Sequence, residues 1–167
     1  VPNGVVKGNV GDFLDDVQPG QVVVIDNGGR LYCTVWGDIM TFVATRKGIA
    51  GTVIDGVCRD IPGILENDYP IFTKSTYMVT GKDRVTVDYV NKPVAISGVQ
   101  VCPNDIILAD DTGAVCIPDA VAEKVADIAE SIEKTEQAII AEVKNGSTLK
   151  EARAKLGYHH LQTHEEG

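Results

Sequence analysis

Short apolar blocks alternate with turn-forming residues along the first third of the chain. The block Gln21–Asp26 is rich in β-branched residues and lies between Pro-Gly and Gly-Gly pairs, which predicts a buried strand. Leu31–Val35 predicts a second strand, Ile39–Lys47 a helix, and Ile49–Ile54 a further buried strand. Strand, helix and strand in this order are typical of a βαβ unit, in which functional groups gather where the strands end.

The rest of the chain is first β-rich and then helical. Short apolar segments separated by Gly, Pro, Asn and Asp predict strands over Ile71–Thr73, Arg84–Val90, Val94–Ile96, Val99–Cys102, Ile106–Ala109 and Ala114–Ile117. From Pro118 to Gly146, apolar residues recur every three or four positions, which predicts one long helix with an apolar stripe. Thr148 and Glu151 have capping-box spacing and predict a last helix ending near Gly157. The predicted fold class is α/β, with a mixed β-rich core and a long C-terminal helix.

Length and composition favour one domain. The 167 residues are 44% hydrophobic, which is enough for one core, and we expect a single domain over residues 1–157 followed by a polar tail over 158–167. Because the chain begins at Val1 without Met, we expect an amino-terminal segment of a longer chain to be missing.

The charge balance argues against two classes of partner. With 15 Lys and Arg against 24 Asp and Glu, the net charge is −9 and there is no basic run, so neither nucleic acid nor an anionic membrane is an expected partner. No apolar stretch approaches the ~20 residues that span a bilayer. The four cysteines are far apart and form no CxxC pair, as is typical of free thiols in a reducing cytoplasm. We therefore expect a soluble, cytoplasmic protein.

The candidate chemistry lies on both sides of the strand predicted over Ile49–Ile54. Gly37 permits close approach of a ligand, and the amides of Ile39 and Met40 at a helix start would bind a carboxylate. Asp60 is a hard oxygen ligand of the kind that Mg²⁺ or Mn²⁺ takes singly or in pairs, with water and substrate completing the shell. Arg59 beside it would supply a fixed cation with forked donors.

Each of these groups also has a structural interpretation. An Arg-Asp pair in a turn is commonly a surface ion pair that contributes about 0–1 kcal/mol. Asp38 and Gly48 would simply cap and end the predicted helix. The order of the groups along the chain, rather than any one of them, favours a functional site.

That order resembles the family of 4-hydroxy-4-methyl-2-oxoglutarate aldolases and the RraA-like regulators of ribonuclease activity. The resemblance rests on the Gly-Asp helix start at Gly37, the glycine-rich strand Gly48–Gly56 and the terminal Arg59-Asp60. It continues into Asp105–Gly113, then Val115 and Pro118, and covers the chain from about residue 4 to residue 145. It implies a single-domain swivelling β/β/α-type fold. Two departures are the missing leading helical segment and Asn104 in place of the usual glycine before Asp105.

The resemblance also implies an activity and a role for each residue. The activity is a class II, metal-dependent cleavage of 4-hydroxy-2-oxo acids to pyruvate through a metal-stabilised enolate, with oxaloacetate decarboxylation as a second reaction of the same site. Asp60 would hold Mg²⁺ or Mn²⁺, and Arg59 would contact the keto oxygen. Gly37 and the amides of Ile39 and Met40 would receive the substrate carboxylate. Asp38 would transfer the proton.

Family members share the site between subunits, so a homo-oligomer, a trimer or dimer of trimers, is expected. A neighbouring subunit would lend an acid, for which Glu133, Glu136 and Glu142 are candidates.

Three other functions fit the sequence less well. Relatives that regulate a ribonuclease act by docking and lack the metal-binding Asp, whereas Asp60 is present here. A Schiff-base mechanism needs a desolvated lysine, and the candidate lysines all lie in polar or turn segments: Lys47, Lys74, Lys82 and Lys92. Methyl transfer would need a nucleotide-binding pattern, which the glycines of Gly48–Gly56 do not provide.

Overall fold

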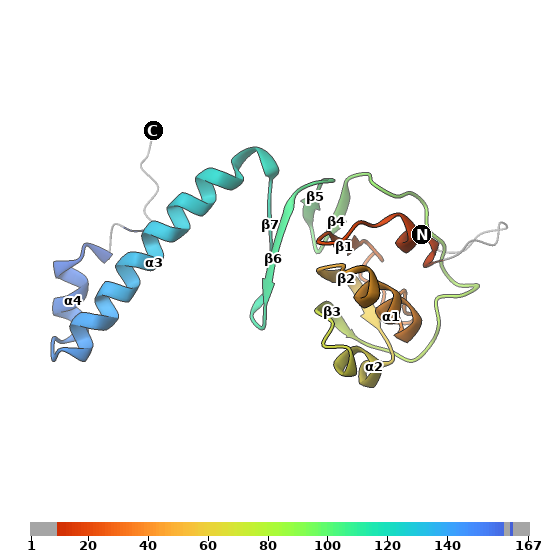
Figure 1. The fold of residues 1–167 in the computed structure, drawn as a ribbon, viewed down its shortest axis with the longest axis horizontal. Helices are drawn as coiled ribbons and strands as arrows, with labels where there is room; N and C mark the ends of the chain where they lie inside the picture. Colours follow the sequence, from red (N-terminus) through yellow and green to blue (C-terminus); the bar gives the residue numbers. More distant parts are fainter. Residues whose placement is uncertain (1–9, 159–160, 162–167) are drawn as a thin grey trace. The chain divides into compact units, whose positions relative to one another are not determined.

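The computed structural model describes residues 10–158 and 161 (Figure 1). The chain divides into two compact units, with the boundary between Asp119 and Ala120, and each unit is described by itself. The single domain predicted over residues 1–157 stays a prediction. Most of the predicted polar tail, including its three histidines, lies outside the described residues.

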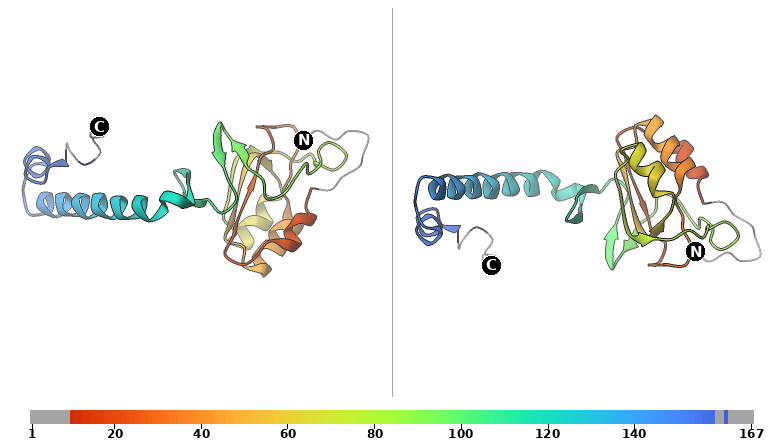
Figure 2. Two further views of the ribbon diagram at one scale, coloured as in Figure 1. Left: turned by 90° about the horizontal axis from the view of Figure 1, so that it is seen from above. Right: turned by 90° about the horizontal axis from the view of Figure 1, so that it is seen from below.

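The first unit is built on a three-stranded parallel sheet. The strands β1 (Val22–Ile25), β2 (Gly51–Cys58) and β3 (Ile71–Thr76) are joined by the helices α1 (Asp38–Lys47) and α2 (Ile61–Glu66). The sheet order is β1-β2-β3, so each successive strand is added on the same side of the previous one. Because β-α-β crossovers are right-handed, both connecting helices then lie on one face of the sheet. Both views of Figure 2 show α1 and α2 on the same face of the sheet. The predicted βαβ unit is confirmed and is repeated once.

An apolar core fills the space between this sheet and its helices. Trp36 stacks on Tyr69 with ring centroids 5.7 Å apart, and the Tyr69 hydroxyl lies 2.8 Å from the Thr52 hydroxyl of β2. Leu14, from the 3-10 turn Asp12–Asp16, is buried in the same cluster. This core fixes the segments that leave β2 and enter α1.

Two predicted strands are wrong. Leu31–Val35 is not a strand: Leu31 and Tyr32 are exposed, and only Thr34 makes isolated bridges, to Val57 and Thr80. The Thr34 side chain bonds neighbouring backbone carbonyls, an alternative to a ladder that Thr offers readily. Arg84–Val90 has the right alternation, but only Val85 is deeply buried and no ladder forms over this segment. Alternation alone does not make a strand when no neighbouring edge is in register.

The remaining strands of the first unit lie where the sequence predicts strands, and they pair as two antiparallel hairpins. They are β4 (Val94–Ile96) with β5 (Val99–Val101), and β6 (Ile106–Asp110) with β7 (Gly113–Ile117). Ser97 and Gly98 both have positive φ, as a tight two-residue hairpin turn requires.

The second unit is helical. After a 3-10 turn at Asp119–Val121, α3 (Ala122–Lys144) packs against α4 (Leu149–Lys155), and α4 begins with the predicted capping box of Thr148 and Glu151. Both predicted helices are confirmed, and so is the α/β class with small sheets and a long C-terminal helix. Within the described residues, no helix has both the length and the apolar character needed to cross a membrane. The four cysteines are free, and two of them are buried.

Candidate functional site

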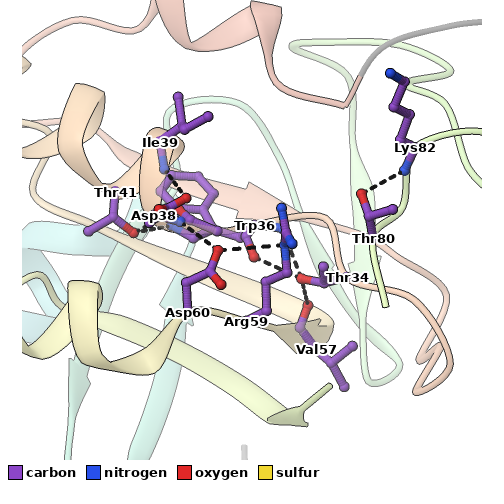
Figure 3. A network of polar contacts seen from close by, with 11 residues as sticks. Thr34, Trp36, Asp38, Ile39, Thr41, Val57, Arg59, Asp60, Thr80 and Lys82 are labelled. Atoms are coloured by element: carbon purple, nitrogen blue, oxygen red, sulfur yellow. Dashed lines mark hydrogen bonds and ion pairs between the residues drawn. The ribbon is translucent and has the colours of Figure 1, made fainter. Parts of the chain in front are cut away.

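The end of β2 and the start of α1 meet in space and bring the predicted site residues together. The amide of Asp38 donates a hydrogen bond to Oδ2 of Asp60 over 3.1 Å, although the two residues are 22 positions apart. Nε of Arg59 lies 3.6 Å from the same oxygen. Figure 3 shows Asp38, Arg59 and Asp60 close to one another. The side chains of Arg59 and Asp60 are half-buried, 40% and 34% exposed, so a ligand can reach them.

A buried polar network holds the two segments in place. Oγ1 of Thr34 lies 2.8 Å from the Trp36 carbonyl oxygen and 3.0 Å from that of Val57, and so ties the segment before α1 to β2. The amide of Arg59 donates to the carbonyl of Trp36 over 3.1 Å. The indole N–H of Trp36 donates to Thr41 of α1 over 2.9 Å (Figure 3). The sequence did not predict this network, because Thr34 and Trp36 stand among apolar residues and form no recognisable motif.

Asp60 has an unusual backbone. It adopts the left-handed region with φ 61°, which non-glycine residues rarely do, and such outliers concentrate at functional sites. Its carbonyl accepts the amides of Gly63 and Ile64 and so begins α2, yet its carboxylate caps no amide of that helix. The side chain is therefore turned from helix capping towards Asp38 and Arg59.

Gly37 makes the close approach possible. A Cβ at this position would lie 2.7 Å from Oδ2 of Asp60 and 3.3 Å from Nε of Arg59. The φ of Gly37 is −150°, which any residue can adopt, so the need for glycine is purely one of space.

We expect Gly37→Ala to displace the Asp60 carboxylate, because a methyl group at this position would lie 2.7 Å from its Oδ2. That carboxylate ends a half-buried side chain that can rotate, so the cost should appear in Mg²⁺-dependent pyruvate release, which should fall about 10–100-fold, rather than in the melting temperature. Gly63→Ala is the control, since its Cβ would meet the Cβ of Asp38 at an ordinary 3.4 Å. Equal pyruvate release by the two variants would contradict the steric role of Gly37.

The start of α1 differs from the prediction in one respect. Asp38 is the first helical residue rather than the cap, because the Gly37 carbonyl accepts the Thr41 amide and so begins the helix. Oδ1 of Asp38 instead accepts the amide of Ile39 over 2.8 Å. Two amides are expected to hold a substrate carboxylate. The Ile39 amide already donates to the Asp38 carboxylate, and the Met40 amide has no acceptor within the described chain. The amides of Asp38 and Ile39 thus already have carboxylate acceptors, and binding of a substrate carboxylate at this helix start stays a prediction.

The residues fit a magnesium-type site better than a zinc-type site. In the described residues, no group of three or more His, Cys, Asp and Glu side chains lies close enough together to hold a metal ion. Zinc usually needs three or four such protein ligands, whereas Mg²⁺ is commonly held by one or two carboxylates with water and substrate. The half-buried carboxylate of Asp60 meets that smaller requirement.

Two of the candidate Schiff-base lysines have structural partners. Nζ of Lys47 donates to the carbonyls of Leu14 and Asp15, and Nζ of Lys74 lies 2.5 Å from the carboxylate of Asp55. Both amines are engaged in structural contacts, whereas a Schiff-base lysine needs an amine that is free to attack the substrate.

Comparison with known proteins places the chain in a family. The sequence profile of the RraA-like family, described as Aldolase/RraA, matches residues 4–116, more than half of the chain. The chain belongs to the RraA-like family. Two curated relatives are DlpA of Legionella pneumophila, 41% identical over 90% of this chain, and a protein of Halalkalibacterium halodurans provisionally named 4-hydroxy-4-methyl-2-oxoglutarate aldolase, 34% identical over 66%. The chain spans only 24% of the length of DlpA and 52% of that of the second relative.

Solved structures of similar proteins have the same fold. An uncharacterized protein of Pseudomonas syringae is 42% identical with a TM-score of 0.83, the match covering 85% of this chain and 71% of that one. RraAS2 of Streptomyces coelicolor, described as an unusual member of the RNase ES inhibitor RraA protein family, is 35% identical with a TM-score of 0.70 over 74% of this chain and 63% of its own. The predicted RraA-like fold is thereby confirmed.

Proposed function

We propose that this chain carries the centre of a cytoplasmic, divalent-metal-dependent lyase that cleaves 4-hydroxy-2-oxo acids to pyruvate. The observation that carries the proposal is the contact between the Asp38 amide and Asp60, because it joins a helix start, an arginine and an acid in one accessible site. Relatives provisionally named as aldolases, at 34% and 31% identity, support a lyase.

Cleavage of such an acid breaks the C3–C4 bond and leaves its electron pair on the pyruvate fragment as an enolate. Asp38, exposed at the start of α1, is the candidate group that would take the proton of the C4 hydroxyl and return a proton to C3 of the enolate to give pyruvate. The Met40 amide and the α1 dipole would hold the C1 carboxylate. Arg59 would donate to the keto oxygen as its negative charge develops. Asp60 would hold Mg²⁺ or Mn²⁺, which supplies Lewis acidity towards that oxygen. Decarboxylation of oxaloacetate would leave the same enolate.

A homo-oligomer, a trimer or dimer of trimers, belongs to this proposal. Ile39 of α1, Leu65 of α2 and Met78 after β3 are 76%, 73% and 80% exposed, as expected of residues that a further subunit covers. Among the candidate lent acids, Glu142 pairs with Lys155 and Glu133 accepts a hydrogen bond from Gln137, so Glu136 is the one without a side-chain partner in the described residues.

Pyruvate release tests the proposal. We expect the purified chain to release pyruvate from 4-hydroxy-4-methyl-2-oxoglutarate and from oxaloacetate when Mg²⁺ is present, and to stop when a chelator is in excess. Release at the rate of a protein-free Mg²⁺ control would overturn it.

A non-catalytic regulator of ribonuclease activity is the second candidate. It is supported by the likeness to RraAS2, 35% identical with a TM-score of 0.70. Inhibition of a ribonuclease by a chain that releases no pyruvate would favour this function over the first.

A further inference from the structure

A second polar cluster lies within β2, before the strand reaches the candidate site. Asp55 is the one charged residue that is buried in the described part of the chain. One of its oxygens lies 2.5 Å from Nζ of Lys74 on β3 and accepts the Ser97 hydroxyl over 3.2 Å. Burial by itself would raise the pKa of Asp55, but the hydrogen bonds from Lys74 and Ser97 and the Lys74 charge outweigh it and lower that pKa below its ordinary value.

The Asp55–Lys74 ion pair lies at an irregularity in the pairing of β2 with β3. Ile54 of β2 pairs with Thr73 of β3, but the next pair is Val57 with Ser75, so two residues of β2, Asp55 and Gly56, face the single residue Lys74. That arrangement is a β-bulge, a device that is common beside active sites and changes the direction of the strand beyond it.

The other side of the bulge is fixed by the turn after β1. The Gly29 amide donates to the Asp55 carbonyl over 2.9 Å. Gly56 lies against Asn27 so closely that a Cβ would come within 2.9 Å of its side-chain nitrogen. The bulge is therefore held from both neighbouring strands.

We propose that Asp55 and Lys74 are positioning residues that set the place of Arg59 and Asp60, an inference that rests on the proposed function. The Asp55–Lys74 pair holds the bulge and so fixes the register of β2 relative to β3 at the end of β2. Beyond the bulge, Cys58 accepts the Tyr77 amide over 2.9 Å, and Arg59 then donates its own amide to Trp36. If the bulge relaxes, the register of this exit shifts, and Asp60 moves away from the start of α1.

The simpler alternative is an ion pair that only stabilises the fold. The two accounts differ in what they predict for metal binding by properly folded protein. Lys74→Gln and Asp55→Asn each remove one charge and keep a hydrogen-bonding group. Each single variant leaves the partner's charge without its counter-charge. The double variant Asp55→Asn/Lys74→Gln carries neither charge and can still form a neutral hydrogen bond across the bulge. Lys150→Gln is the matched control for loss of one positive charge, because Lys150 of α4 is exposed and belongs neither to the candidate site nor to the helix that carries the candidate lent acids.

The test measures the Mn²⁺ dissociation constant by electron paramagnetic resonance, the melting temperature, and kcat and KM for pyruvate release. We expect each single variant to bind Mn²⁺ about 10–100-fold more weakly, the usual effect of residues that orient a metal ligand, with kcat falling more than KM rises. The double variant should recover part of that affinity, and Lys150→Gln should match the wild type. Single variants that melt lower but keep wild-type Mn²⁺ affinity and kcat would overturn the positioning role. Wild-type protein that neither binds Mn²⁺ nor releases pyruvate would instead overturn the proposed function, and the positioning role with it.

Discussion

Asp60→Asn is expected to lower Mg²⁺-dependent pyruvate release by more than about 10²-fold, since changes outside the ligand shell already cost about 10–100-fold. Asn keeps an oxygen that can accept the Asp38 amide, and it tolerates the left-handed backbone with φ 61°. It removes the negative charge on which cation binding depends. The melting temperature should therefore stay near that of the wild type, while Asp60→Ala loses both the contact and some stability.

Asp68→Asn is the matched control for this result. Asp68 follows α2 and is also left-handed, with φ 47°, but it has no place in the proposed site. Steady-state assays at several Mg²⁺ concentrations make the comparison. If Asp60→Asn kept wild-type turnover, or if its activity fell no further than that of Asp68→Asn, the metal role of Asp60 would have to be withdrawn.

Arg59→Ala is expected to lower kcat by about 10²–10³-fold, the usual cost of losing one preorganised donor to a developing oxyanion. The effect should fall on kcat more than on KM, because the contact strengthens as the C–C bond breaks. The backbone amide of Arg59 that binds Trp36 survives the substitution, so the melting temperature should change little. Arg59→Lys should lie between, since Lys lacks the planar fork.

A structural role for Arg59 predicts the opposite pattern. Its ion pair with Asp60 is 3.6 Å long and 40% exposed on the Arg side, so it contributes little stability of its own. Loss of stability with unchanged turnover in Arg59→Ala would make it a simple ion-pair partner. The melting temperature and kcat, measured on the same preparation, separate the two roles.

Locally encoded features of the fold could be predicted from sequence. The helix α1 ends at Gly48, whose φ of 70° is the left-handed conformation that glycine favours. The capping box of Thr148 and Glu151 likewise needs only residues three positions apart. By contrast, Arg84–Val90 alternates as a strand does, yet a strand depends on a paired edge elsewhere in the chain, and sequence periodicity does not supply one.

In the candidate site, too, some features could be predicted from the sequence and others depend on residues far apart in the chain. The proximity of Asp38 and Asp60 follows from a βαβ unit whose strand ends meet. The bulge at Asp55 could not be predicted, because Asp55 and Lys74 lie 19 positions apart (74 − 55) on neighbouring strands and their register is a property of the whole sheet. Nor did the sequence show that the Asp38 carboxylate would already accept the Ile39 amide, which depends on one side-chain rotamer.

The most direct test of the central claim, a metal-dependent enolate at Arg59 and Asp60, is hydrogen exchange into pyruvate itself. Pyruvate in D₂O loses its methyl proton signal in nuclear magnetic resonance spectra when the enolate forms, whichever substrate the protein prefers. The wild type with Mg²⁺ should exchange these protons well above a protein-free Mg²⁺ control, excess chelator should abolish the exchange, and Arg59→Ala should slow it. Exchange at the control rate, or exchange that is indifferent to chelator, would contradict the account.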